Sequence, residues 1–471
     1  MTLKRTFLHS CGALLIGLAA VHSPPAFAVN DAMLDLLKIL RDKGSLTQDE
    51  YDMLMNASKA DAEHVNFAKE EVKRIDTTNI VTKDKFTFTS KDGDFEWQPI
   101  GRIMADYHIV DSDLYAIDTE GAFRRSRLGM QGKMWGKWIW KIEYDFSSGS
   151  ADMKDGYVGY EQAYANGKWN IKAGQHHIPF GVATISSSKY LTLLERPLLA
   201  DGELQPARNL GLSGFIHGGD VWTLQAGIYG ASEGTPADPN TFEEVNIAAR
   251  GTWNPYLKDP VHLVHVGGSV WYRNPNDSSL RIRQRPGVIR ASDERFIDAN
   301  FGAGKAEDVL AFDAEALAIW GPFHLQGEYV HWNVSPKTPA AWSAAYPGDV
   351  DLNGYYIEAS YFLTGESMNF KAAEGVFSGV KPFSVAGKGG IGAWQVAIRY
   401  DVMDLNDFVT GAGAGVRGGL ERHLRAGLKW YPTQNLNFMA DYVTVLELDR
   451  PGSVYHDDEP DSFNLRALVY W

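Results

Sequence analysis

The sequence predicts an all-β fold, a transmembrane antiparallel β-barrel of about 16 strands, preceded by a short α-helical segment. Two observations predict it. From about residue 97 to the C-terminus, apolar and polar residues alternate with a period of two, whereas apolar residues near the N-terminus recur at helical spacing. The gaps between the alternating segments are short and long in turn, which is the loop arrangement of membrane barrels.

The alternation is clearest in segment 138–146. Its odd positions include charged residues, and its even positions are all apolar or aromatic: Trp138, Trp140, Ile142, Tyr144 and Phe146. Successive side chains of an extended strand point to opposite faces. A soluble sheet needs a deep core to cover such an aromatic face, whereas lipid covers it directly. We therefore expect one face to contact lipid and the other to face a lumen.

The last segment of the chain repeats this pattern. Asn464 and Arg466 lie on one face, opposite a wholly apolar set: Phe463, Leu465, Ala467, Val469 and Trp471. A chain that ends on an aromatic residue of an alternating strand resembles the assembly signal of outer-membrane barrels. Because each unpaired peptide group in lipid costs several kcal/mol, the sheet must close on itself. A closed barrel of about 16 strands encloses an aqueous lumen.

Sixteen alternating segments account for the strands. They lie near 97–109, 123–134, 137–146, 154–164, 168–175, 209–217, 220–230, 243–253, 261–273, 308–320, 322–332, 353–363, 391–401, 421–431, 435–446 and 462–471. Short connections are expected at Gly136, Asn166-Gly167, Gly218-Gly219, Gly321 and Pro432-Thr433, and long ones at 110–122, 176–208, 231–242, 274–307, 333–352, 402–420 and 447–461. The stretch 364–390 is long where a short turn is due. Either the strand count slips there or that turn carries an insertion.

The N-terminal residues 1–28 have the pattern of a secretory signal peptide. Lys4 and Arg5 precede an apolar run, Ala13 to Val21, and a small-x-small site follows at Ala26-Phe27-Ala28. We expect cleavage after Ala28. Removal of Cys11, the only cysteine of the chain, excludes disulfides and thiolate metal sites from the mature protein.

Residues 29–80 are predicted to form a helical or coiled-coil segment in the periplasm. Leu34, Leu37 and Leu40 recur at helical spacing, and Gly44 ends the first helix. Thr47-x-x-Glu50 is a capping box for a second helix, and a charged helical stretch follows from Glu63 to Arg74. Such a module either oligomerises or is a solvated arm. The barrel domain then covers 95–471.

Composition limits the class of protein and of solute. The chain has 14 Trp, 21 Tyr, 22 Phe and 47 Gly, which aromatic girdles and turn glycines would account for. No apolar run of 18 residues remains after the signal peptide, so a helical membrane protein is excluded. The net charge of −14 becomes −16 once Lys4 and Arg5 are removed. Any affinity for anions must therefore come from the position of the basic residues.

The long connection 176–208 is the expected constriction, because a barrel this wide is unselective unless a loop folds inward. Its hydroxyl and basic residues can replace the hydration of an oxyanion with directed hydrogen bonds. They include Ser187, Ser188, Lys189 and Arg196. The alternative is that these residues only pack the loop against the wall.

A basic run lies in the long loop 274–307. Arg281, Arg283 and Arg285 are spaced by two, so an extended segment points all three the same way, and Arg290 and Arg295 follow. A row of guanidinium groups lets an anion pass between several moderate sites. The alternative is an exposed loop that binds lipopolysaccharide phosphates outside the pore.

The second strand carries further basic residues toward the lumen. Arg125, Arg127 and Lys133 share one face with Gln131. The same alternation makes Lys141 and Lys172 lumen candidates. Arg124 has the opposite parity, so it is expected at the rim.

No set of residues supports an enzyme, a cofactor or a metal. Gly-x-Ser-x-Gly is absent. His176 and His177 are adjacent on a strand and should point oppositely, and His262 and His265 also differ in parity. An outer-membrane hydrolase is therefore disfavoured.

The chain resembles the phosphate-selective porin O and P family over nearly the whole mature sequence. The motifs that carry the resemblance are Phe123 to Gly129, Lys141 to Phe146, Lys154 to Tyr157, Ser187 to Leu191 with Glu195-Arg196, Arg281 to Pro286 and Leu363 to Glu366. The resemblance implies a homotrimer of 16-stranded barrels, each with its own anion pore. It places Ser187, Ser188 and Arg196 in the central constriction, Arg125 on the lumen wall nearby, and Arg281, Arg283 and Arg285 in an arginine ladder. Thr184 stands where phosphate-specific members carry a lysine, which puts phosphate specificity in doubt.

These features together predict passive diffusion of phosphate or related small anions across a bacterial outer membrane. The expected partners are these anions, outer-membrane lipid and lipopolysaccharide, and two further copies of the chain; no nucleic acid is expected. Two alternatives remain. One is a pore of the same build with general or different selectivity, and the other is a non-conducting adhesin or lipopolysaccharide-binding barrel.

Overall fold

The computed structural model describes residues 29–57, 79–81, 86–112, 114, 119–200, 206–230, 244–275, 279–285, 295–338, 348–409 and 414–471. It has two compact units, Met1–Thr78 and Asn79–Trp471. The predicted signal peptide at 1–28, the helical stretch from Glu63 to Arg74 and Arg290 lie outside the described residues. No helix among those described is long and apolar enough to cross a membrane.

The first unit contains α1 (Val29–Asp42) and a second helical run at 48–57. Gly44 lies just beyond α1 with a φ of 71°, as expected for a helix C-terminus. The capping box is confirmed, because the Thr47 backbone N–H donates to the Glu50 carboxylate at 2.9 Å and the Glu50 N–H donates to Thr47 Oγ1 at 3.3 Å. The Arg41 guanidinium lies 4.6 Å from the centre of the Tyr51 ring, so the two helical segments contact each other.

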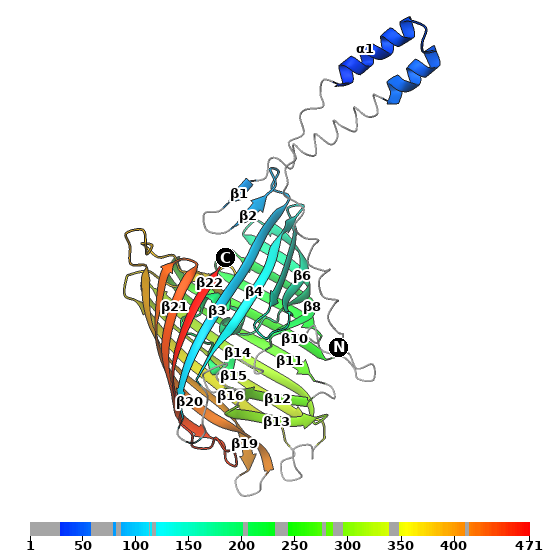
Figure 1. Ribbon diagram of the computed structural model, residues 1–471. Helices are drawn as coiled ribbons and strands as arrows, with labels where there is room; N and C mark the ends of the chain where they lie inside the picture. The colour runs from blue at the N-terminus through cyan, green and yellow to red at the C-terminus, as the bar shows by residue number, and fades with distance from the viewer. Residues whose placement is uncertain are drawn as a thin grey trace, which may run out of the picture. The chain divides into compact units, whose positions relative to one another are not determined.

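The second unit is a closed antiparallel barrel of sixteen strands (Figure 1), which confirms the predicted fold class. The wall strands are β3 (Glu96–Asp111), β4 (Glu120–Met134), β5 (Trp138–Asp145), β6 (Asp152–Tyr164), β7 (Gly167–His177), β8 (Arg208–Gly218), β9 (Trp222–Tyr229), β10 (Val245–Asp259), β11 (His262–Asn274), β14 (Ala306–Trp320), β15 (Phe323–Pro336), β16 (Val350–Phe362), β19 (Ala393–Val409), β20 (Ala414–Thr433), β21 (Leu436–Asp449) and β22 (Asp461–Tyr470). Each of the sixteen predicted segments coincides with one of them. The ring closes where β22 pairs with β3, Tyr470 opposite Arg102. Two short strands, β1 (Asn79–Val81) and β2 (Thr87–Thr89), extend the sheet beside β3.

Alternation along the strands separates a lipid face from a lumen face. On β22, Phe463 is 43% exposed and Leu465 41%, whereas Asn464 is 1% exposed and Arg466 3%. Inside a barrel, buried polar residues of this parity face the lumen, and exposed apolar residues contact lipid. The short connections, such as those at Gly136 and Gly321, define the short-turn rim, and the opposite end is the long-loop rim.

The stretch 364–390 is an insertion, so the strand count does not slip. It contains the hairpin of β17 (Asn369–Lys371) and β18 (Val376–Ser378). Phe370 and Phe377 of this hairpin are buried in one cluster with the wall residues Leu317, Phe362 and Tyr431. Leu317 has the parity of the lumen face, and therefore the hairpin folds into the barrel from the short-turn rim.

The long loop 274–307 also folds inward. It forms the hairpin of β12 (Ser279–Gln284) and β13 (Ile297–Ala303) near the long-loop rim (Figure 1). Leu280 and Ile282 pack in one cluster with Met403 and Leu405. Met403 and Leu405 share the parity of the buried Arg399 on β19, so the hairpin covers the lumen face of that strand.

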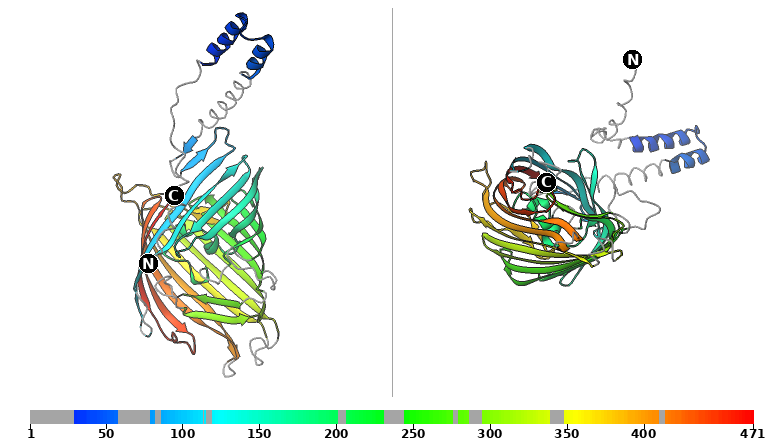
Figure 2. Two further views of the ribbon diagram at one scale, coloured as in Figure 1. Left: turned by 45° about the vertical axis from the view of Figure 1, so that its right-hand side comes forward. Right: turned by 90° about the horizontal axis from the view of Figure 1, so that it is seen from below.

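A third inward segment follows β7. It contains the single helical turns α3 (Val182–Ile185), η1 (Ser188–Tyr190) and η2 (Leu198–Ala200). We call residues 178–200 the constriction segment. Seven of its apolar residues are almost fully buried: Ile178, Phe180, Val182, Leu193, Leu194, Leu198 and Leu199. Figure 2 looks into the ring of strands that surrounds these inward segments.

Candidate functional site

A cavity of about 570 Å³ lies between the constriction segment and the wall strands β3 to β9. Its lining is strongly basic. Among the described residues, three acidic residues line it, Asp155, Glu161 and Glu374, and eight basic ones: Arg102, Arg125, Arg127, Lys141, Lys168, Lys172, Arg196 and Arg208. In a chain with a formal charge of −14, the described lining of this cavity therefore carries an excess of positive charge.

The predicted serines lie in this cavity beside an arginine of β3. Arg102 Nη1 donates to Ser188 Oγ at 2.8 Å and to Ser187 Oγ at 3.3 Å, and its Nη2 donates to Glu143 Oε1 at 3.0 Å. Because the hydroxyl oxygens accept from Arg102, their hydrogens can donate to an anion. Arg102 was not among the predicted pore residues, although the alternation of segment 97–109 puts it on the lumen face.

Arg125 and Arg127 both line the cavity. Arg127 is neutralised, since its Nε donates to Asp145 Oδ2 at 2.8 Å. Among the described residues, the Arg125 guanidinium has one side-chain hydrogen bond, to Met104 Sδ at 3.5 Å, and no acidic group within 4.0 Å. Within this part of the chain, Arg125 is thus a cation of the cavity without an ion pair.

Arg124 also points inward, so its predicted place at the rim is wrong. The register between β3 and β4 shifts at Met104 and Ala105, which leaves Arg124 as the extra residue of a β-bulge. Its guanidinium donates to both carboxylate oxygens of Glu195, at 2.9 and 3.1 Å. Burial raises the pKa of Glu195, but the nearby arginines outweigh this effect and hold its pKa well below the usual value.

Arg196 organises the constriction segment from within. Its Nε donates to the carbonyl of Ala183 at 2.7 Å, and its Nη2 donates to the carbonyls of Ser186 at 2.7 Å and Thr184 at 3.3 Å. Thr184 itself lines the cavity. Arg196 therefore closes the loop that carries the serines.

Charged side chains of the opposite wall fasten the same segment. Lys429 Nζ donates to the Leu191 carbonyl at 2.6 Å, and Arg399 donates to the carbonyls of Glu195 and Arg196 at 2.9 and 3.0 Å. Carboxylates accept the backbone N–H groups: Asp441 that of Leu194 at 3.2 Å, and Asp401 that of Leu198 at 3.0 Å. These wall residues hold the constriction in one position, because their charges satisfy its backbone donors and acceptors.

Four predicted lysines have different surroundings. Lys141 and Lys172 line the cavity, and Lys172 Nζ lies 5.1 Å from the centre of the Tyr157 ring. Lys133 is ion-paired to Glu161 at 3.1 Å, a carboxylate that Lys168 also contacts at 3.1 Å. Lys189 lies outside the cavity lining, with its ammonium 5.6 and 5.3 Å from the rings of Tyr190 and Tyr470. Burial, and then the charge of Arg102, lowers the pKa of Lys189 to about 7.

The three arginines predicted to form a ladder are on the β12–β13 hairpin and its end, not in the cavity. Leu280, Ile282 and Gln284 are buried on the opposite face of β12, so Arg281, Arg283 and Arg285 share one face. Arg281 Nε donates to Asp298 Oδ1 at 2.7 Å. None of these three arginines is among the residues that line the basic cavity.

A model of the family described as phosphate-selective porin O and P matches residues 100–471, well over half of the sequence. The chain belongs to this family. Together with the barrel, this makes the protein an outer-membrane porin with a channel through its lumen.

Known proteins resemble this porin over most of its length. Porin O of Pseudomonas aeruginosa is 28% identical over 414 residues, which cover 82% of this chain and 91% of that protein. A protein of Caulobacter vibrioides is 28% identical over 379 residues, 78% of this chain and 71% of the relative. Among solved structures, the trimer form of OmpT from Vibrio cholerae has a TM-score of 0.48 at 13% identity, covering 80% of this chain and 99% of OmpT.

The prediction that paired histidines point oppositely is met by one pair and not by the other. His176 and His177 both line the cavity at the end of β7, although adjacent residues of a strand should point oppositely. His262 contacts Asp259 at 2.9 Å and is partly exposed, whereas His265 is fully buried. These last two differ in direction, as their spacing predicts.

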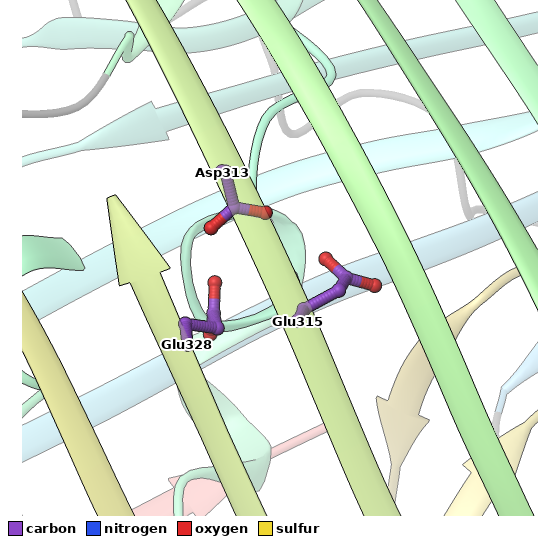
Figure 3. A group of neighbouring side chains, drawn as sticks. All are labelled: Asp313, Glu315 and Glu328. Carbon is purple, nitrogen blue, oxygen red and sulfur yellow. The ribbon is translucent and has the colours of Figure 1, made fainter. Parts of the chain in front are cut away.

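Three carboxylates meet on the lumen face of the porin wall (Figure 3): Asp313 and Glu315 from β14, and Glu328 from β15. Glu315 is already paired, with Arg250 and with His265 Nε2 at 2.9 Å. Glu328 accepts the backbone N–H of Ala183 at 2.8 Å. Asp313 accepts from Ser269 Oγ at 3.4 Å, so all three hold structural contacts, and that of Glu328 anchors the constriction segment.

Proposed function

We propose that this porin lets phosphate or related small anions diffuse passively through its lumen. One observation carries the proposal: a basic cavity beside the serines of the constriction contains Arg125, a guanidinium without an acidic partner among the described residues. A partly dehydrated oxyanion is stabilised by charge-assisted hydrogen bonds from such a group and from the hydroxyls of Ser187 and Ser188. The concentration gradient of the solute supplies the driving force, and no cofactor is required.

The basic lining favours anions over cations but does not identify the anion. Two selectivities therefore have to be distinguished. Thr184 places a neutral hydroxyl in the cavity lining, where phosphate-specific members of the family carry a lysine. The first candidate is a pore that favours phosphate over chloride. The second, which Thr184 favours, is a pore for small anions in general.

The remaining parts of the proposal concern assembly and export. We propose cleavage of the signal peptide after Ala28, a homotrimer in the outer membrane, and a periplasmic place for the helical segment. The basic run with Arg281, Arg283 and Arg285 is proposed as an outer approach to the channel, since it lies near the long-loop rim and outside the cavity.

Reversal potentials of the porin in planar bilayers test the function. In a potassium chloride gradient, we expect permeability to chloride to exceed that to potassium, and Arg125→Ala should lower this ratio about twofold to threefold at low salt. Lys258→Ala, which removes an exposed lysine at the end of β10, is the matched control. Phosphate added to chloride solutions should block chloride current if the site prefers phosphate. A preference for potassium, or an absence of current, would refute the anion pore, and the latter would favour the adhesin.

A further inference from the structure

One carboxylate enters the basic cavity from the inserted hairpin. Glu374 belongs to the turn between β17 and β18 and lines the cavity with Val376. Glu374 therefore places a negative charge in the path proposed for anions. Such a charge has no part in the binding of anions by the serines and the wall arginines.

The other two acidic residues of the cavity are each held between two cations. The carboxylate of Asp155 lies 2.7 Å from Lys141 Nζ and 3.0 Å from Arg208 Nε. Glu161 is held in the same way by the two lysines described above. The charges of both acids are therefore cancelled locally.

Glu374 has a weaker counter-ion. Among the described residues, its carboxylate is paired only with Lys371, at 3.2 Å on the same tight turn. The two side chains are 48% and 51% exposed, and Lys371 is not among the residues that line the cavity. Exposed pairs of this kind contribute little and are screened by water. Within the described residues, Glu374 thus has a single exposed counter-ion, where Asp155 and Glu161 each have two.

The position of Glu374 is fixed by the backbone around it. Arg250 Nη2 donates to the Gly375 carbonyl at 2.9 Å, and the Phe377 N–H donates to Ser186 Oγ at 3.2 Å. Gly375 has a φ of 64°, which suits glycine and closes the turn. The hairpin therefore presents Glu374 from a position next to the serine segment.

We propose that Glu374 is a specificity-determining residue that disfavours multivalent anions relative to monovalent ones. The repulsion between a fixed carboxylate and a passing anion is proportional to the charge of the anion. If Glu374 lowers the local concentration of a monovalent anion by a given factor, it lowers that of a divalent anion by the square of the factor. This inference rests on the proposed passage of anions through the cavity.

Sulfate and chloride are suitable probes, because they differ in charge and neither changes its charge near neutral pH. Reversal potentials in potassium chloride and potassium sulfate gradients give the permeability of each anion relative to potassium, and about 0.01 M salt is used because screening is weakest there. Glu374→Gln should raise the ratio of sulfate to chloride permeability about twofold. Lys371→Met, which removes the counter-ion, should lower this ratio.

Glu447→Gln is the matched control, because Glu447 also belongs to an exposed ion pair, with Arg422, but lies outside the cavity lining. It should leave the ratio of sulfate to chloride permeability unchanged. An equal ratio in wild type, Glu374→Gln and Glu447→Gln would overturn the inference. A wild-type pore that prefers potassium to both anions would instead refute the proposed function itself. Heat-modifiable migration of each variant on gels verifies that its barrel is folded.

Discussion

The guanidinium of Arg124 and the carboxylate of Glu195 form a two-point ion pair, at 2.9 and 3.1 Å, between the bulge of β4 and the constriction segment. Glu195 also accepts from Arg466 of β22 at 2.5 Å, and Arg466 is paired with Asp106 of β3 at 2.6 Å. Because β22 and β3 form the seam that closes the barrel, this chain of charges joins the seam to the constriction. One buried carboxylate thus pairs with two arginines, the buried Arg466 and the half-buried Arg124.

Glu195→Gln should destabilise the porin strongly, since Arg124 and Arg466 lose a shared partner while they stay buried. A loss of roughly 3–5 kcal/mol in the free energy of unfolding is expected. Urea unfolding in lipid vesicles, followed by tryptophan fluorescence, measures it. Glu447→Gln, which breaks an exposed pair, should cost at most about 1 kcal/mol. Equal losses in the two variants would contradict a special role for Glu195.

The same ion pair predicts a response to acid. The pKa of Glu195 is well below its unfolded value, so its contribution to stability is complete above the ordinary pKa of a glutamate, about 4.3. This contribution is lost as the pH falls through the lower, folded pKa. The free energy of unfolding should therefore fall less on acidification in Glu195→Gln than in the wild type. Urea unfolding at several pH values measures this difference.

Gly181→Ala should disturb the constriction more than an equivalent change elsewhere. Gly181 has a φ of 64°, and an added Cβ would lie 2.6 Å from Glu328 Oε2. Gly321 has a φ of 57° with nothing within 4 Å, so Gly321→Ala measures the backbone strain alone, about 1–2 kcal/mol. We expect Gly181→Ala to lose more unfolding free energy than Gly321→Ala. Only Gly181→Ala should alter the single-channel conductance. The same conductance change in both variants would exclude the contact with Glu328 as its cause.

Anion selectivity should fall as the pH rises from about 6 to 8, because Lys189, with a pKa of about 7, loses its charge beside the serines. The probe is chloride, whose charge is independent of pH. A change of about twofold in the ratio of chloride to potassium permeability is expected. Lys189→Arg keeps the charge at both pH values and should remove this step. If the step persists in Lys189→Arg, another group causes it.

Replacement of Arg281, Arg283 and Arg285 together by Ala should reduce anion conductance at low salt, where screening is weakest. The reduction should be smaller than in Arg125→Ala, because these three residues lie outside the cavity and Arg281 is paired with Asp298. Conductance measured at about 0.01 and 1 M salt separates a field effect, which vanishes at high salt, from a change in pore width. An unchanged current at low salt would remove the arginines from the conduction path.

The sixteen strands of the wall were predictable from the sequence, because alternation is a local property that each segment carries alone. The lumen direction of Arg127, or of Asn464, follows from the same rule. The alternation rule fails at Arg124, because a bulge adds one residue to the strand there and reverses the parity around it. No residue type near Arg124 signals this shift, because it arises from the pairing with β3.

Local sequence is enough to give the sheet a lipid face and an aqueous face, since lipid and water select side chains of opposite polarity along every strand. The segments that fill the lumen are set instead by packing between distant parts of the chain. The β12–β13 hairpin, the β17–β18 hairpin and the constriction segment meet there from remote parts of the chain, and contacts such as that of Arg102 with Ser188 depend on their packing. These contacts form because closure of the ring brings together residues that are far apart in the sequence. No local sequence pattern signals that such residues will meet.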